Sequence, residues 1–283
     1  MDITFAKVQA SGNDFIVLDN RQNRLAEKIR DFAQFAAFAC RRKYSVGADG
    51  LLVLEDSGSC DFRMRIFNPD GSEVDMCGNG IRCSALYAYA KEWCGNIMKI
   101  ETKAGHLESE VSTGTDGETN GRNAASVSVK MTAPGDIKLN QNLGIEKSIV
   151  NVHTINSGVP HAVHFVENIN SYPVKEMGGK IRYHKIFEPK GTNADFVEVL
   201  GGSNISVRTY ERGVEDETLA CGTGVVASAI ISHLINGTKG PVCVTTKSGE
   251  AVKVRFRKEQ NRFKDVYLEG KAQIVFEGSI HYV

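Results

Sequence analysis

The sequence has no long apolar run and no excess of charge of one sign. Its best apolar stretch, residues 225–231, is interrupted by Ser228 and falls far short of the roughly 20 residues that a membrane-spanning helix needs. The 34 basic and 34 acidic residues cancel, which favours a small neutral or zwitterionic substrate over nucleic acid or a membrane. The first residues lack the basic and apolar regions of a signal peptide, so we expect a cytoplasmic protein.

The cysteine pattern lacks the features of a disulfide framework and of a zinc site. Seven cysteines are an odd number, and no Cys-x-x-Cys pair occurs. The histidines also show no spacing typical of metal ligands, so we predict no metal. Free cysteine is usually buried, and five of the seven are expected to be core residues: Cys40, Cys60, Cys83, Cys94 and Cys243.

The other two cysteines lie in matching glycine-rich motifs. Cys77-Gly78-Asn79-Gly80 and Cys221-Gly222-Thr223-Gly224 each precede a run of residues that reads as a helix. A Thr-Lys-Ala-Gly sequence follows the first motif, and Thr-Lys-Ser-Gly follows the second at the same distance. This repetition predicts a duplicated fold. A further similarity, between residues 12–17 and 192–197, suggests another pair of matching strands.

Two thiols at helix N-termini suggest proton transfer from two sides of one carbon. The helix dipole and the free backbone N–H groups of the first turn favour a thiolate. One thiolate could remove an α-proton while a thiol on the opposite face supplies one, which inverts a stereocentre without a cofactor. The dipole contributes only about 0.3–1 kcal/mol. The larger contribution would therefore come from backbone N–H groups that stabilise charge on the substrate carboxylate.

Length and periodicity predict two domains. A chain of 283 residues exceeds a comfortable single core, and the polar, glycine-rich residues 113–123 are the best linker candidate. We place the N-terminal domain at residues 1–122 and the C-terminal domain at 123–268. Helices are expected at residues 25–39, 78–94, 175–182 and 223–235, and strands at 3–19 with a break at 11–13, 51–54, 62–67, 127–131, 163–166, 242–246, 251–257, 266–268 and 272–276.

Four segments, which span nearly the whole chain in the expected order, resemble the diaminopimelate epimerase family. They are residues 11–15, 67–72, 76–82 and 210–224. Asn79 separates the chain from the proline racemases, which resemble Cys-Gly-His-Gly at this site, and PhzF-like isomerases lack the cysteine pair. The resemblance implies an α+β fold of two pseudo-symmetric domains, each a β-barrel-like sheet around a central helix. It also implies that strand 269–283 returns to the first domain, and that the protein is a homodimer.

The same resemblance implies a reaction and a set of site residues. The reaction interconverts LL- and meso-2,6-diaminopimelate for lysine and peptidoglycan synthesis, with no pyridoxal phosphate or other cofactor. Cys77 and Cys221 would be the two acid–bases, with His161 tuning Cys77 and Glu211 serving Cys221. Arg212 would bind the distal carboxylate through its bidentate guanidinium. The remaining substrate contacts would come from Asn13, Asn68, Gly78, Asn79, Asn193, Gly222 and Thr223.

Two departures from the family pattern leave alternatives open. The commonest family pattern at one site is Gly-Asn-Pro-His, and this chain has Val159 in place of the asparagine. At a second site some members resemble Gly-Ala-Asp-Gln, and this chain has Gly50 in place of the glutamine. Both positions bear on recognition of the far end of the substrate. A racemase of another amino acid, with histidine tested first, is therefore one alternative. A thiol redox protein is a second, because two thiols that flank one carbon could approach disulfide geometry.

Overall fold

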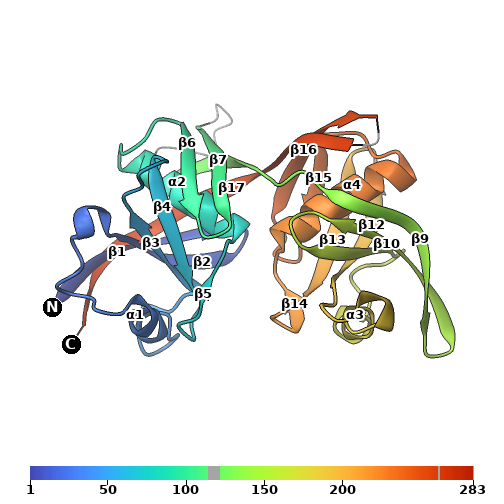
Figure 1. Ribbon diagram of the computed structural model, residues 1–283, viewed down its shortest axis with the longest axis horizontal. Helices are drawn as coiled ribbons and strands as arrows, with labels where there is room; N and C mark the ends of the chain where they lie inside the picture. The colour runs from blue at the N-terminus through green and yellow to red at the C-terminus, as the bar shows by residue number, and fades with distance from the viewer. Residues whose placement is uncertain (114–121, 261, 283) are drawn as a thin grey trace. The chain divides into compact units, whose positions relative to one another are not determined.

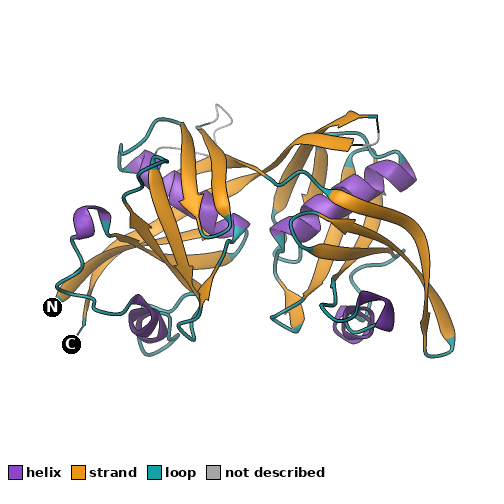
Figure 2. Ribbon diagram, viewed as in Figure 1, coloured by secondary structure: helices purple, strands orange, loops and turns teal. Residues whose placement is uncertain are grey.

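The computed structural model describes residues 1–113, 122–260 and 262–282 (Figures 1 and 2). The predicted linker at 113–123 lies mostly outside these residues. The chain divides into unit 1, residues 1–129 with 270–283, and unit 2, residues 130–269. The boundary follows Val129 rather than residue 122, because β8 (Ala124–Lys130) pairs with β7 (Gly105–Ser112) of unit 1. No helix among the described residues is long and apolar enough to cross a membrane.

Unit 1 is a closed β-barrel around one helix. Its strands pair in the order β17–β1–β2–β3–β4–β6–β7–β8, and β8 pairs with β17. Residues 79–88 of the enclosed helix α2 (Gly78–Ala90) are all buried, as expected for a helix surrounded by strands (Figure 2). The other strands are β1 (Asp2–Ala10), β2 (Asn13–Asp19), β3 (Gly50–Glu55), β4 (Phe62–Phe67), β6 (Ile97–Thr102) and β17 (Arg262–His281), with the short β5 (Glu73–Val74) on β4.

Unit 2 repeats this pairing scheme. Its strands pair in the order β9–β10–β11–β12–β13–β15–β16–β17, and residues 224–232 of its central helix α4 (Gly222–Asn236) are all buried (Figure 1). The parallel pairs β11/β12 and β13/β15 correspond to β2/β3 and β4/β6 of unit 1. The predicted α+β fold with two pseudo-symmetric domains is confirmed. The strands are β9 (Gly135–Ile145), β10 (Ser148–Asn156), β11 (Pro160–Phe165), β12 (Asn193–Gly201), β13 (Asn204–Glu211), β14 (Asp216–Thr218) on β13, β15 (Val242–Thr245) and β16 (Ala251–Glu259).

The similarity between residues 12–17 and 192–197 is not a trace of the duplication. Residues 13–17 lie in β2, whose counterpart by pairing is β11, whereas residues 193–197 lie in β12, the counterpart of β3. Both segments are buried strands that begin with a polar residue at the start of the strand. Both segments therefore have a polar residue followed by apolar ones, which accounts for their similarity.

Several element boundaries differ from the sequence prediction. Helix α1 (Phe32–Ala39) begins only after Asp31, whose carboxylate accepts hydrogen bonds from the N–H groups of Ala33 and Gln34. Helix α2 ends at Ala90, before the expected stop at Gly95. The two strands expected at 266–268 and 272–276 form one continuous strand, β17, because its pairing passes from β16 to β1. Helix α4 ends at Asn236, and the following Gly237 caps it in the left-handed conformation.

Of the five cysteines expected in the core, only Cys40 and Cys83 are buried. Cys60, Cys94 and Cys243 are half-buried, so the prediction is wrong for these three. Cys60 and Cys94 follow turns at the ends of secondary-structure elements, and Cys243 lies on a strand whose alternate residues are buried. All seven cysteines are free thiols in this structure.

Helix α3 (Val174–Arg182) packs on β13 through a glycine, which gives a matched pair of stability predictions. A Cβ at Gly178 would lie 2.3 Å from Tyr210 Cβ and 2.7 Å from Cγ, whereas one at Gly179 would come no closer than 3.9 Å to the Tyr210 hydroxyl. Gly178→Ala should lower the free energy of unfolding by about 1–3 kcal/mol through overpacking. Gly179→Ala should raise it by about 0.5–1 kcal/mol, because alanine favours the helix. Urea denaturation measures both, and equal effects of the two variants would contradict the packing described.

Candidate active site

The two motif cysteines occupy equivalent places in the two units. Cys77 is the N-cap residue of α2 and Cys221 is the N-cap residue of α4, each with an extended backbone. The carbonyl oxygens of Cys77 and Cys221 accept the first helical hydrogen bonds, from Ile81 and Val225 respectively. Neither thiol caps its helix. Each sulfur therefore lies at the N-terminal end of a buried helix, where the first-turn N–H groups are free of helical partners.

The motif glycines are required for space rather than for unusual backbone angles. Gly80, Gly222 and Gly224 lie inside the helices. A Cβ at Gly224 would lie 2.4 Å from Asp195 Oδ1 and 3.0 Å from Thr209 Oγ1, and one at Gly80 would lie 3.2 Å from Leu52 Cδ2. These glycines allow the helix N-termini to approach the surrounding strands closely.

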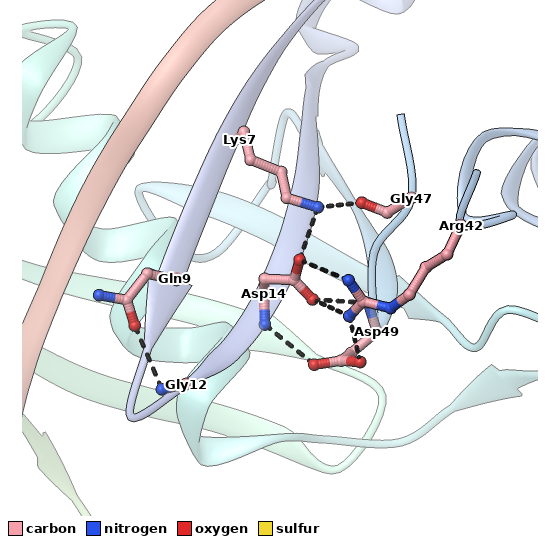
Figure 3. A network of polar contacts seen from close by, with 7 residues as sticks. All are labelled: Lys7, Gln9, Gly12, Asp14, Arg42, Gly47 and Asp49. Carbon is pink, nitrogen blue, oxygen red and sulfur yellow. Dashed lines mark hydrogen bonds and ion pairs between the residues drawn. The ribbon is translucent and has the colours of Figure 1, made fainter. Parts of the chain in front are cut away.

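In unit 1, Asn13 lies beside the first thiol. Its Nδ2 is 4.0 Å from Cys77 Sγ, and its buried Oδ1 has no hydrogen-bond partner among the described residues. Asn13 begins β2, directly after a turn in which Ser11 and Gly12 have positive φ. A polar network on the same turn and strand includes Gly12 N donating to Gln9 Oε1 (Figure 3). The turn thus presents an amide to Cys77 from a fixed strand end.

The strand that follows Asn13 is anchored by a charged cluster. Lys7 Nζ lies 2.7 Å from Asp14 Oδ2 and also bonds the Gly47 carbonyl, while Arg42 Nη2 lies 2.7 Å from Asp14 Oδ1 and 2.8 Å from Asp49 Oδ1 (Figure 3). Burial alone would raise the pKa of Asp14, but Lys7, Asp49 and Arg42 together hold it below its ordinary value. Asp14 is therefore ionised at neutral pH and fixes the start of β2.

Sequence reasoning gave no role to Arg82, which the structure places behind the first motif. Its side chain is only 1% exposed, and its Nη2 donates to Asn79 Oδ1 at 2.6 Å and to Ser11 Oγ at 2.9 Å. Its Nη1 donates to the Lys271 carbonyl at 3.3 Å. Arg82 thus holds the side-chain oxygen of Asn79, and a contact between Asn79 and substrate stays a prediction. An arginine within an otherwise apolar helix was the sequence signal for this residue.

Asn68 is part of a tight turn. Its Nδ2 donates to Ser72 Oγ at 3.0 Å, and its backbone carbonyl accepts a hydrogen bond from Gly71 N at 2.9 Å. Gly71 has a positive φ, and a Cβ there would lie 2.8 Å from the Ala33 carbonyl oxygen. The Asn-Pro-Asp-Gly sequence therefore forms the turn that its residues favour. A contact between Asn68 and substrate stays a prediction.

In unit 2, Cys221 has a specific set of neighbours. Its sulfur lies 3.4 Å from Thr223 Oγ1, and Thr223 Oγ1 lies 2.9 Å from His161 Nε2. Burial, followed by the charges of Glu211 and Asp195, raises the pKa of Cys221 well above its ordinary value of 9.0, although Thr223 and the Gly224 N–H oppose the shift. The lowered pKa expected for a thiol at a helix N-terminus is wrong for Cys221, because desolvation outweighs the dipole.

The other predicted residues of unit 2 surround the same helix N-terminus. Asn193 Oδ1 accepts from Arg212 N at 2.8 Å, and its Nδ2 donates to the Pro160 carbonyl at 3.1 Å. Arg212 Nη1 donates to the Lys190 carbonyl at 3.4 Å. Burial raises the pKa of Glu211 above its ordinary value. The contacts seen for His161 lead to Cys221 through Thr223, and its assignment to Cys77 stays a prediction.

A separate cavity in unit 2 reaches His161 but neither motif cysteine. Its volume is about 810 Å³, and its lining includes Pro160, His161 and Thr192. The rest of its lining is mostly polar and comes from β9, β10 and the segment around Phe187. Because no thiol lines it, this cavity alone does not form the predicted proton-transfer site.

The two departures from the family pattern have different surroundings. A Cβ at Gly50 would lie 3.0 Å from the Phe67 carbonyl oxygen and 3.2 Å from the Phe15 ring, so a glutamine would not fit there without movement of β2 or β4. Val159 lies in the turn before β11, where its carbonyl accepts from Ser157 N at 3.2 Å. Close packing against β2 and β4 thus explains why this chain has glycine at position 50.

Proteins of one family are similar to this chain over nearly its whole length. Residues 5–132 and 153–275 match a family model described as diaminopimelate epimerase. Proteins named diaminopimelate epimerase from Aquifex aeolicus and Methanocella arvoryzae are each 41% identical to this chain over 98% of its length, and the matches cover 97% and 96% of their own lengths.

Solved structures share the fold at low sequence identity. A Bacillus anthracis phenazine biosynthesis protein of the PhzF family has a TM-score of 0.74 at 17% identity and covers 100% of both chains. A hydroxyproline epimerase from Agrobacterium vitis has a TM-score of 0.68 at 14% identity, with 99% of this chain and 92% of that chain covered. At these identities the similarity shows the fold alone.

Proposed function

Because this chain belongs to the diaminopimelate epimerase family, we propose that it is the isomerase that interconverts LL- and meso-2,6-diaminopimelate, in lysine and peptidoglycan biosynthesis. The observation that carries the proposal is the pair of thiols, Cys77 and Cys221, each at the N-terminus of a buried central helix in a duplicated fold. A two-base reaction needs one acid–base group for each face of the α-carbon, and a thiol can serve as either acid or base. The sequence identity of 41% over nearly the whole chain supports the choice of substrate.

The protonation states of the two thiols set the first step. The raised pKa of Cys221 means that this residue rests as a thiol. In either direction, the thiolate of one cysteine removes the α-proton and the thiol of the other donates its proton to the opposite face of the carbon. After one turnover the two residues have exchanged roles. The pair needs no cofactor, because the transferred proton comes from one sulfur and the abstracted proton goes to the other.

The charge that develops on the substrate carboxylate needs fixed hydrogen-bond donors. The backbone N–H groups of Gly78, Asn79, Gly222 and Thr223 are at the helix N-termini and suit this role. Removal of one such donor typically costs about 100- to 1000-fold in rate. These donors therefore supply more of the rate enhancement than the helix dipole does.

Other groups would hold the substrate and tune the thiols. Arg212 would bind the distal carboxylate, and the unpartnered Oδ1 of Asn13 would accept from the substrate ammonium. Asn68 and Asn193 would contribute polar contacts. Glu211 would act on Cys221, and His161 would tune Cys77. The cytoplasmic location belongs to the same proposal, because this chemistry requires reduced thiols. The homodimer is proposed from the family resemblance.

Hydrogen exchange at the α-carbon tests the proposal directly. The protein is incubated with LL-diaminopimelate in deuterated water under reducing conditions, without pyridoxal phosphate. We expect α-deuterium in the product and approach to an equilibrium of LL and meso isomers, measured by mass spectrometry and chiral chromatography. Exchange with histidine but not with diaminopimelate would identify an amino-acid racemase instead. Thiol–disulfide activity without exchange of any amino acid would identify a redox protein.

A further inference from the structure

The cavity of about 810 Å³ in unit 2 lies against the outer face of the sheet. Its lining includes Thr154 on β10, Pro160 at the start of β11 and Thr192 just before β12. His161 faces inward, because its ring contacts Thr223 of the enclosed helix α4. Side chains alternate along a strand, so Pro160 faces outward, and the register places Thr154 on the same face. Among the described residues that line the cavity, His161 is the only predicted site residue.

The central helices show which place in unit 1 is equivalent to this cavity. A Cβ at Gly80 of the first motif would lie 3.2 Å from Leu52 Cδ2 on β3. A Cβ at Gly224, which has the same position in the second motif, would lie 2.4 Å from Asp195 Oδ1 on β12. Leu52 and Asp195 are therefore counterparts. The pairing of β2 with β1 and β3, and of β11 with β10 and β12, extends the match to the residues beside the cavity. The matched residues are Lys7 with Thr154, Asp14 with Pro160, and Asp49 with Thr192.

In unit 1 the three matched residues are charged and belong to one bonded cluster. Lys7 Nζ and Arg42 Nη2 each lie 2.7 Å from an oxygen of the Asp14 carboxylate (Figure 3). Arg42 Nη2 also lies 2.8 Å from Asp49 Oδ1. Long side chains that bond one another thus occupy this end of the outer face in unit 1. In unit 2 two threonines and a proline replace the charged residues, which leaves room for the cavity.

Strand β9, which forms one wall of the cavity, departs from regular pairing there. Its register with β10 shifts between Val152 and Thr154, and again between Thr154 and Asn156. Asp136 and Asn140 of β9 both have positive φ, and both line the cavity. Bulges of this kind are common beside functional sites, where they change the direction of a side chain. The irregular part of β9 thus coincides with the cavity wall.

Two opposite charges in the lining have no partner in the described chain. Asp136 and Lys138 lie two residues apart on β9, and neither forms an ion pair with another described residue. The side chains of Gln141 and Thr154 form no hydrogen bond with any described residue either. Hydrogen bonds between charged partners are stronger than neutral ones. A molecule with one ammonium and one carboxylate group would therefore satisfy both charges, and the polar side chains offer it further hydrogen bonds.

The cavity also has an apolar part. Leu139 and Ile186 line it and are 39% and 49% exposed, although both are large apolar residues. Phe187 belongs to the same part of the lining. Burial of such side chains against an aliphatic group is favourable, because it removes apolar surface from water. The volume of the cavity lies within the range of about 300–1000 Å³ that is typical of small-molecule sites.

We propose that this cavity binds a free amino acid with an uncharged aliphatic side chain, its ammonium group at Asp136 and its carboxylate at Lys138. The aliphatic side chain would lie against Leu139 and Ile186. The one acid and one base of the described lining match a ligand of zero net charge, so an amino acid with a charged side chain, such as lysine, should bind more weakly. This site is separate from the candidate active site, and the inference does not rest on the proposed function.

The first test titrates the wild-type protein with L-leucine in a calorimeter. Two analogues serve as controls: 4-methylpentanoate lacks the ammonium group, and 3-methylbutylamine lacks the carboxylate. Each loses one charged hydrogen bond, so each should bind at least about tenfold more weakly than L-leucine. L-Lysine should also bind more weakly. No detectable binding of L-leucine, or equal affinity for L-leucine and either analogue, would overturn the proposal.

The second test locates the binding by substitution. Lys138→Met and Asp136→Asn each remove one charge with little change of size, and each should lower the affinity for L-leucine at least about tenfold. Lys147→Met is the control, because Lys147 is an exposed lysine of the same β9–β10 hairpin outside the cavity. It should leave the affinity within about twofold of wild type. Equal effects of Lys138→Met and Lys147→Met would overturn the proposal.

Arg212→Met separates this cavity from the candidate active site. Arg212 does not line the cavity, so its replacement should leave the affinity for L-leucine within about twofold of wild type. Loss of L-leucine binding in Arg212→Met but not in Lys138→Met would place L-leucine in the candidate active site and overturn the proposal. A protein that binds L-leucine through Lys138 but does not epimerise diaminopimelate would refute the proposed function and support this inference.

Discussion

Cys77→Ala and Cys221→Ala are each expected to lower net epimerisation by about 100- to 10,000-fold, the contribution typical of a positioned acid–base group. Each variant keeps one sulfur, so one face of the α-carbon loses its proton donor or acceptor. The remaining thiol cannot replace it, because inversion needs proton transfer on both faces. The assay follows conversion of LL- to meso-diaminopimelate by chiral chromatography under reducing conditions.

Cys94→Ala is the matched control for these variants. Cys94 is a half-buried free thiol of unit 1 that lies outside both motifs, after the end of α2. Its replacement should leave epimerisation within about twofold of wild type and the unfolding free energy within about 0.5 kcal/mol, as for substitutions away from special features. Full activity in Cys77→Ala or in Cys221→Ala would exclude the two-base reaction, whatever the control shows.

Arg82→Met is expected to lower the free energy of unfolding by about 3 kcal/mol, because each buried polar group that loses its partner costs roughly 1–3 kcal/mol. Methionine fills much of the same volume but leaves Asn79 Oδ1 and Ser11 Oγ without the guanidinium that now bonds them. The variant also frees the Asn79 side chain at the N-terminus of α2, so epimerisation should fall in the protein that remains folded. Urea denaturation followed by circular dichroism measures the stability.

Two controls separate the buried contacts from the loss of a positive charge. Arg82→Lys keeps the charge but not the planar fork, and should recover only part of the lost stability. Arg41→Met removes an exposed arginine of unit 1 and should change the unfolding free energy by less than about 0.5 kcal/mol. If Arg82→Met and Arg41→Met have equal effects, Arg82 does not hold Ser11 and Asn79 as the contacts indicate.

Local sequence patterns predicted much of the fold because the two units carry similar short motifs. Each Cys-Gly-x-Gly motif is followed by residues suited to a buried helix, and the structure has a central helix at both places. The prediction that residues 12–17 and 192–197 form matching strands of the duplication is wrong, and the reason is also physical. Buried strands of one chain resemble one another in composition wherever they lie, so only the pairing of β2 with β3 and of β11 with β12 identifies the true counterparts.

The spacing of residues in the sequence could not predict the pKa shifts of the site residues. A helix N-terminus favours a thiolate, but whether desolvation exceeds that effect depends on how deeply the sulfur is buried, and Cys221 is only 7% exposed. In the same way, Asp195 is one more residue of a strand in the sequence. Only the folded chain brings His161, Thr209 and Gly224, which are distant in the sequence, together around its carboxylate.

The sequence by itself determined the family, the duplicated architecture and the two thiols at helix N-termini, because these follow from short motifs whose chemistry is local. Tertiary structure alone decided that Arg82 bonds the Asn79 side chain, that burial raises the pKa of Cys221, and that Asp195 contacts His161. Those outcomes depend on solvent exclusion and on hydrogen bonds between residues far apart in the chain, and neither is encoded in any one segment.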